Sequence, residues 1–229
     1  LTACAKVKLS PLFSDNMVLQ QEAEVPVWGK ASPEMRVRVI PSWSGGKYEN
    51  IADRTGNWKV NIKTPKAGGP YHLEITDGEK VRLENVMIGE VWLCSGQSNM
   101  QMPVEGWGKV KNYQQEVAQA NYPDIRLMTV SNTISLSPSQ EFTAVGGGWQ
   151  VCSSVTIREF SATAYFFGRE IARTQQVPVG LICAHWGGTN IEPWISAQAL
   201  GEVPDFVEQL KLIRRLGNKD CDLQAEEEQ

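Results

Sequence analysis

The sequence lacks several features that would assign it to common functional classes. None of its apolar runs approaches the roughly 20 residues that a membrane-spanning helix needs. It also has no cluster of basic residues, and its 22 Lys and Arg against 26 Asp and Glu give a net charge of -4. Binding to nucleic acid relies on clustered cations that neutralise phosphates, so the composition argues against a nucleic-acid partner. A C-x-x-C pair is missing as well, and neither a metal site nor an organic cofactor is implied.

Cysteine is scarce and scattered, with an odd count of five. Cys94 and Cys183 lie inside apolar runs, which predicts that they are buried as small hydrophobic residues. Cys4 ends the run Leu1 to Cys4, a small-residue tetrapeptide typical of the site at which bacterial lipoprotein signals are cut. This favours a periplasmic or extracellular protein with a lipid anchor at Cys4. The alternative is an arbitrary N-terminus that happens to contain a cysteine.

The first third of the chain has the pattern of a small β-sandwich. Short alternating segments predict half-buried strands at 25–29, 35–40, 58–62 and 71–75. Glycine pairs and Asp-Gly or Asn turns separate them, and the strands recur about every ten residues without a helical period. We therefore expect a β-sandwich accessory domain over residues 1–85.

After Asn85 the pattern changes to that of an α/β domain. A nearly continuous apolar run at 86–94 predicts a strand buried on both faces. Phe160, Ala164, Phe167 and Ile171 share one face of a predicted helix over 159–174, which Pro178 ends. A second apolar run at 179–184 then predicts another strand. Strand, helix and strand form a crossover, which implies a parallel sheet.

The remaining segments are less regular. They predict a short helix at 112–120, a strand at 125–130 and an amphipathic helix containing Phe206, Leu210 and Ile213, followed by an acidic end from Cys221. Too few parallel strands are present for a full doubly wound sheet. The fold class is therefore α/β, with part of a flavodoxin-like parallel-sheet domain over residues 86–229 preceded by the β-sandwich.

Two predicted strands end in segments suited to acyl transfer. In a parallel sheet the loops after the strands emerge at one edge, where ligands of open α/β sheets bind. A serine at a sharp turn, Ser98, exposes its hydroxyl and its own N–H, which stabilises an oxyanion. Gly187 and Gly188 allow a reacting carbonyl to approach backbone N–H groups. Trp186 and Trp194 offer apolar walls to a sugar ring.

Each of these features is weak alone, because a Gly-x-Ser triplet and a glycine pair both occur by chance. Residues 96–100 read Gly-Gln-Ser-Asn-Met, which lacks the second glycine of the nucleophile elbow of α/β-hydrolases. The expected position of Ser98 and the glycine pair at one edge of the sheet favours a catalytic interpretation.

Four separated motifs, in order, resemble the sialate O-acetylesterase family, whose catalytic domain is of the SGNH-hydrolase type. The resemblance extends from about residue 7 to residue 200. The motifs are FSDNMVLQQ at 13–21, GEVW at 89–92 running into GQSNM at 96–100, FSA with YFFG between 160 and 168, and WGGT at 186–189 with Glu192 and Trp194.

The resemblance implies an ester hydrolase that removes O-acetyl groups from sialic acids. Ser98 corresponds to the family nucleophile, and the Gly187-Gly188 pair to the glycine block of the oxyanion hole, which also includes the Ser98 N–H. The residues expected to bind an O-acetylated sialic acid or related acetylated glycan are Gln97, Asn99, Trp186, Asn190, Glu192 and Trp194. Two family blocks, a Gln-Gly-Glu segment and an Asp-x-x-His segment, have no counterpart here. We therefore expect the isolated chain to have little or no turnover.

Only two histidines are present. His185 precedes the glycine pair at the expected sheet edge, which makes it a candidate base, but no carboxylate is obviously placed to hold its tautomer. His72 lies on an alternating strand of the β-rich region and is interpreted as structural.

Two alternatives remain open. The same motifs serve esterases that deacetylate plant polysaccharides such as acetylated xylan. A noncatalytic carbohydrate-binding protein, with Trp107, Trp186 and Trp194 as stacking surfaces, also fits the composition.

Overall fold

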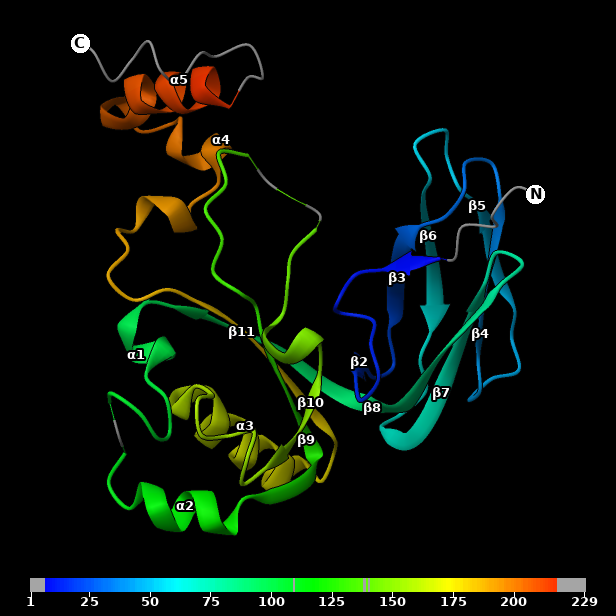
Figure 1. Cartoon of the computed structure of the whole chain (residues 1–229), viewed down its shortest axis with the longest axis horizontal. Coiled ribbons are helices and arrows are strands. Elements are labelled where there is room, and N and C mark those ends of the chain that lie inside the picture. Colours follow the sequence, from blue (N-terminus) through cyan, green and yellow to red (C-terminus); the bar gives the residue numbers. More distant parts are fainter. Residues whose placement is uncertain (1–6, 109, 138, 140, 218–229) are drawn as a thin grey trace. The chain divides into compact units, whose positions relative to one another are not determined.

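The computed structural model describes residues 7–108, 110–137, 139 and 141–217 (Figure 1). Cys4 and the acidic end from Cys221 lie outside the described residues. The strands are β1 Lys8–Leu9, β2 Val18–Gln20, β3 Glu24–Lys30, β4 Arg36–Pro41, β5 Tyr48–Ile51, β6 Asn57–Lys63, β7 Gly68–Thr76, β8 Lys80–Gly96, β9 Asn121–Thr129, β10 Gln150–Ser153 and β11 Val179–His185. The α-helices are α1 Ser98–Gln101, α2 Tyr113–Gln119, α3 Ala162–Gln175, α4 Ala197–Leu200 and α5 Val207–Leu216, with short 3-10 turns η1 Val145–Gly147, η2 Glu192–Trp194 and η3 Pro204–Phe206.

The N-terminal strands form the predicted β-sandwich. One sheet has the order β1-β3-β6, and the other continues through β8-β7-β4-β5 with antiparallel pairing. Alternate residues of the facing strands fill the space between the sheets, as the period of two requires. Val27, Val39, Ile62 and Ile75 are all fully buried there. The four predicted strands are present, whereas β1, β2 and β5 were not predicted because they are too short to carry a clear alternation.

Strand β8 joins the sandwich to the α/β region as one continuous strand, which Figure 1 shows crossing from one to the other. Its first half pairs with β7, and its second half, Glu90–Gly96, pairs in parallel with β11. The predicted domain boundary after Asn85 falls inside this strand. The division of the chain into two domains at Asn85 stays a prediction.

The α/β region contains the expected crossover. Strand β11 lies between β9 and β8 and is parallel to both, while β10 adds an antiparallel edge next to β9. Helix α3 precedes β11 and packs against it. The α3 helix begins later than predicted, at Ala162, because the Ser161 hydroxyl accepts a hydrogen bond from the Ala164 N–H and caps the first turn.

The predicted apolar face of α3 is confirmed except at Phe167: Phe160 and Ala164 are buried, and Ile171 packs against the same core. Phe167 is 38% exposed and packs edge to face against Trp92, with ring centroids 5.0 Å apart. Tyr165 and Gly168, which were not predicted, are buried in the core as well. A β-carbon on Gly168 would lie 2.6 Å from Leu181 Cδ1, so glycine lets the helix approach β11 closely.

The expectation that 86–94 is buried on both faces is wrong at its C-terminal end. Trp92 is 41% exposed and Leu93 is 69% exposed. The cause is the pairing: beyond Gly89, β8 has a strand partner on one side only among the described residues. A strand with one free edge buries less of its surface than a central one.

The chain divides into two compact units. The first holds the described residues up to Ser131 together with Phe142–Gly187, and the second holds Asn132–Glu141 and the described residues from Gly188 onward. In the second unit, α4 and α5 bury Leu200 and Leu210. No helix of the described residues is long and apolar enough to cross a membrane.

Candidate active site

The loop after β8 begins with a turn that requires glycine. Gly96 has a φ of +154°, and a β-carbon there would lie 3.2 Å from Met100 Cβ. The register pairs Gly96 with His185, the last residue of β11. The Trp186 N–H extends this pairing by donating to the Gly96 carbonyl at 3.1 Å. The ends of β8 and β11 therefore lie side by side, as the crossover predicted.

Ser98 is the first residue of α1 and is exposed. No hydrogen bond of its hydroxyl is found within the described part of the chain. Hydrogen bonds hold α1 and the residue after it against the start of α3: the Thr163 hydroxyl donates to the Asn99 carbonyl at 2.9 Å, and the Ala162 N–H donates to the Met102 carbonyl at 2.9 Å. The backbone of Ser98 is thus held in place through α1, while its hydroxyl has no hydrogen-bond partner among the described residues.

Gly187 lies directly against Ser98. A β-carbon at position 187 would come within 3.0 Å of Ser98 Oγ and 3.4 Å of Ser98 Cα. The Gly187 N–H donates a hydrogen bond to Gln101 Oε1 at 2.6 Å. The structure therefore brings together the serine and the first residue of the glycine pair. The N–H of Gly187, however, already has an acceptor.

His185 does not have the environment of a base in a catalytic triad. Its Nδ1 atom is buried and has no hydrogen-bond partner among the described residues. Burial lowers the pKa of this imidazole below its usual value, because a charged ring loses hydration there. With no carboxylate bound to Nδ1, nothing fixes the tautomer that a general base requires.

Other predicted site residues fall into both units. Gln97 precedes α1, Asn99 lies within it, and Trp186 is half-buried after β11. The second unit holds Gly188, Asn190, Glu192 and Trp194. Their placement around Ser98 stays a prediction.

Within the second unit, the predicted binding residues have defined local environments. Trp194 is 37% exposed, and its indole N–H donates to the Thr189 hydroxyl at 2.9 Å. Glu192 begins the turn η2, and its Oε2 atom is buried without a hydrogen-bond partner among the described residues. The N-cap position of that turn is Ile191.

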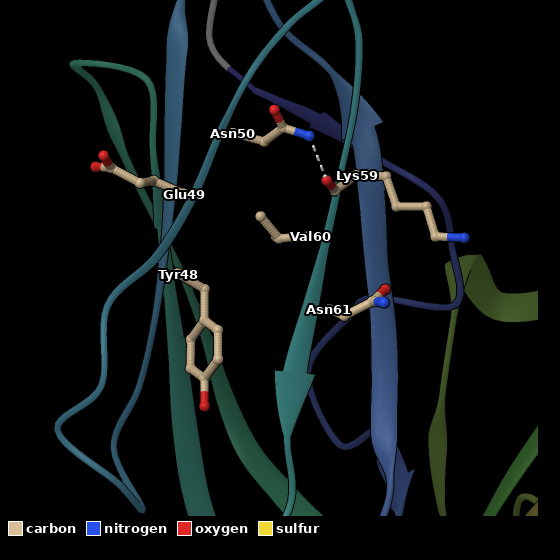
Figure 2. Close-up of a pocket in the computed structure, with 6 residues that line it drawn as sticks. All are labelled: Tyr48, Glu49, Asn50, Lys59, Val60 and Asn61. Carbon is tan, nitrogen blue, oxygen red and sulfur yellow. Dashed lines mark hydrogen bonds between the residues drawn. The ribbon is translucent and has the colours of Figure 1, made fainter.

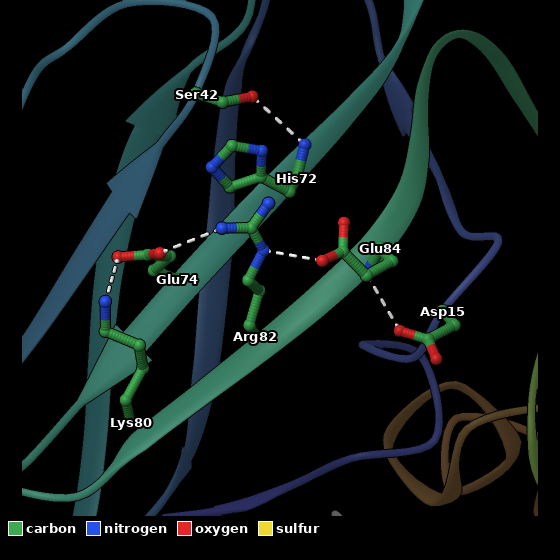
Figure 3. A network of polar contacts seen from close by, with 7 residues as sticks. All are labelled: Asp15, Ser42, His72, Glu74, Lys80, Arg82 and Glu84. Carbon is green, nitrogen blue, oxygen red and sulfur yellow. Dashed lines mark hydrogen bonds and ion pairs between the residues drawn. The ribbon is translucent and has the colours of Figure 1, made fainter.

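His72 lies on the outer face of β7, within a surface network (Figure 3). Its backbone N–H donates to the Ser42 hydroxyl at 3.0 Å. Nearby, Arg82 bridges the Glu74 and Glu84 carboxylates. Lys80, which hydrogen-bonds Glu74, lowers the pKa of that carboxyl. These contacts agree with the structural interpretation of His72.

A hollow of about 450 Å³ opens between β5 and β6 (Figure 2). Val60 lines it, as do Asn50 and Lys59, and the Asn50 amide donates to the Lys59 carbonyl at 2.8 Å. Tyr48, Glu49 and Asn61 complete the lining. None of the predicted site residues lines this hollow.

The sequence analysis missed Gln101 and Thr163. Both anchor the serine loop through side-chain hydrogen bonds. A weak signal was present for Gln101, because a residue three positions after Ser98 on a helix lies near the same face. Thr163 gave no signal, since its partner is 64 residues away in the chain.

Comparison with known proteins places this chain in a class of carbohydrate esterases. The family model described as carbohydrate esterase, sialic acid-specific acetylesterase, matches residues 88–219. The chain belongs to this family.

Individual relatives agree with this assignment. The chain is 32% identical to the sialate O-acetylesterase of Homo sapiens over 209 residues, which are 84% of this chain and 39% of that protein. For the Mus musculus sialate O-acetylesterase the identity is 32% over 205 residues, 82% of this chain and 37% of that protein. A crystal structure described as a novel carbohydrate acetylesterase from Xanthomonas citri superposes with a TM-score of 0.78 at 36% identity, covering 86% of this chain and 44% of that one. The chain thus spans about two fifths of the length of these relatives.

Proposed function

We propose that this chain carries the nucleophile of an acetylesterase that removes O-acetyl groups from sialic acids. The observation that carries the proposal is the position of Ser98, exposed at the end of β8 with Gly187 of the β11 loop against it. Family membership supports the choice of an acetylated carbohydrate as substrate.

The reaction proceeds through an acyl-enzyme. The Ser98 oxygen attacks the acetyl carbonyl, its proton passes to a base, and the sugar alcohol leaves as it takes up a proton. Water then attacks the acetyl-serine, and the bond to Ser98 Oγ breaks to release acetate. Backbone N–H groups stabilise the oxyanion of both tetrahedral intermediates. Of the proposed donors at Ser98, Gly187 and Gly188, the Gly187 N–H is engaged by Gln101 in the resting structure.

We propose that the base and its orienting acid lie in sequence outside these 229 residues. Without a base a serine hydroxyl is a weak nucleophile at neutral pH. The unpartnered Nδ1 of His185 supports the view that this residue does not act in its place.

Acetate release from an O-acetylated sialic acid tests the proposal directly. The 229-residue chain is expected to turn over slowly, and Ser98→Ala to abolish what activity there is. Robust turnover by the chain that His185→Ala removes would overturn the missing-base proposal.

A second candidate substrate is an acetylated polysaccharide such as xylan. The structural relative from Xanthomonas citri supports this candidate, because it is described more broadly as a carbohydrate acetylesterase. Rates on acetylated xylan and on O-acetylated sialic acid, measured side by side, distinguish the two. The noncatalytic alternative rests on Trp107, which is 70% exposed. Tight glycan binding unchanged by Ser98→Ala, with no labelling of Ser98 by a serine-reactive phosphonate, would favour it.

Lipidation of Cys4 and a periplasmic or extracellular location belong to the same proposal. Mass spectrometry of the N-terminal peptide from the natural host, with and without Cys4→Ser, tests the anchor. An unmodified Cys4 would contradict the proposed lipid anchor.

A further inference from the structure

Gln101 connects the two loops at the edge of the parallel sheet. It is the last residue of α1, whose first residue is Ser98, and its Oε1 atom accepts the Gly187 N–H at 2.6 Å. A residue three positions after another on a helix lies near the same face. The side chain of Gln101 therefore reaches across to the β11 loop on the side where Ser98 lies.

The backbone at Gly187 leaves little room for movement. A β-carbon there would meet Gln101 Oε1 at 2.7 Å and Ser98 Oγ at 3.0 Å. Both atoms thus lie on the same side of the Gly187 backbone. The hydrogen bond fixes the distance between this backbone and the serine.

We propose that Gln101 is a positioning residue for the reaction proposed above. Its side-chain carbonyl holds the Gly187 turn against Ser98, so that the turn is already in place when the acetyl group arrives. Preorganised backbone groups cost no rearrangement during the reaction, which is why their placement affects rate. In this proposal Gln101 holds the Gly187 N–H, so that of the three donors proposed above the Ser98 and Gly188 N–H groups are left for the oxyanion. The inference rests on the proposed function of Ser98.

The role requires an acceptor atom at the end of the side chain, which allows a matched pair of variants. Gln101→Glu keeps an oxygen acceptor for the Gly187 N–H. Gln101→Met keeps the length of the side chain but has only a weak sulfur acceptor. Gln119→Met, at the exposed last residue of α2, controls for a Gln-to-Met change at the end of a short helix.

The contact itself is measured by NMR on the isotope-labelled 229-residue chain, without any need for turnover. We expect the Gly187 amide to exchange with solvent slowly in the wild type, Gln101→Glu and Gln119→Met, and about tenfold or more faster in Gln101→Met. An NOE between the Gly187 Hα and Ser98 protons is expected in the wild type, Gln101→Glu and Gln119→Met, and is expected to be lost in Gln101→Met. Unchanged exchange and an unchanged NOE in Gln101→Met would overturn the proposal.

The functional consequence is measured by the rate at which a serine-reactive phosphonate labels Ser98. Gln101→Met is expected to lower this rate about tenfold while the melting temperature stays near that of Gln119→Met, and Gln101→Glu to restore the rate. Equal rates in Gln101→Met and the wild type would refute a positioning role. If the phosphonate does not label the wild type, the proposed function of Ser98 loses its support. The exchange rate of the Gly187 amide and the NOE to Ser98 still test the Gln101 contact in that case.

Discussion

Gly187 approaches Ser98 so closely that a β-carbon at position 187 would lie 3.0 Å from the serine hydroxyl oxygen. The two residues are 89 positions apart in the chain, and the parallel pairing of β8 with β11 brings them together. A side chain at position 187 has to displace either Ser98 or the Gln101 amide.

Gly187→Ala is expected to lower the free energy of unfolding by about 1–3 kcal/mol, the usual cost of overpacking. It should also shift the amide resonances of residues 98–101. Chemical denaturation and NMR spectra measure the two effects. Gly46→Ala, in the β-sandwich, serves as the control and should leave those resonances in place. Unchanged resonances in Gly187→Ala would contradict the close approach.

Arg126 stabilises the junction between the sandwich and the α/β region. It is 3% exposed and donates to the carbonyls of Asn16, Asn85 and Pro123 and to the Asn85 side chain. Burial lowers the pKa of its guanidinium, but arginine stays charged at neutral pH.

Arg126→Met leaves these acceptors without a donor and is expected to cost about 3 kcal/mol or more. Arg173→Met is the control, because the Arg173 side chain is 70% exposed and its ion pair with Glu170 contributes little. It should change stability by about 0.5 kcal/mol or less. Urea unfolding of both variants measures the difference, and equal midpoints would contradict the assigned role of Arg126.

His185 makes stability depend on pH in a defined direction. Burial lowers the pKa of its imidazole in the folded state, so the unfolded chain binds the proton more readily. Stability is therefore unaffected above the ordinary histidine pKa of about 6.5 and falls as pH decreases through that value toward the folded-state pKa.

Urea unfolding from pH 8 to pH 5 is expected to show this loss, and His185→Gln to reduce it. His72 is present in both proteins, so the difference isolates His185. An imidazole that titrates at or above about 6.5 in the folded protein, followed by NMR, would be inconsistent with the structure.

The three described cysteines are free and buried. Cys94 and Cys183 occupy paired positions on β8 and β11, and burial raises the pKa of the Cys152 thiol to about 12. A hydrogen bond with Cys94, together with burial, raises the pKa of the Cys183 thiol, and the same hydrogen bond lowers that of Cys94. All three side chains are buried, so a reagent reaches them poorly and they are expected to resist alkylation at pH 8.

The measurement uses a Cys4→Ser, Cys221→Ser background. Iodoacetamide should modify the folded protein at least about tenfold more slowly than the protein in denaturant. Rapid modification of Cys94 or Cys183 in the folded state would show that the end of β8 opens readily.

The sequence by itself determined the local elements and the chemistry at their ends. Alternation in the first third predicted the sandwich strands, and the apolar run before Gly96 together with the run before His185 predicted two parallel strands ending in a serine loop and a glycine loop. These properties depend on residues close together in the chain, and the period of the side chains records them.

Only the tertiary structure decided which contacts those loops make. The exposure of Leu93 follows from the one-sided pairing of β8 beyond Gly89 among the described residues, and the close approach of α3 to β11 depends on Gly168 lying against Leu181. The hydrogen bond between Gln101 and Gly187 joins residues 86 positions apart. Strand order, the approach of a helix to a strand and side-chain reach arise from packing between distant segments, which the hydrophobic period of a single segment does not encode.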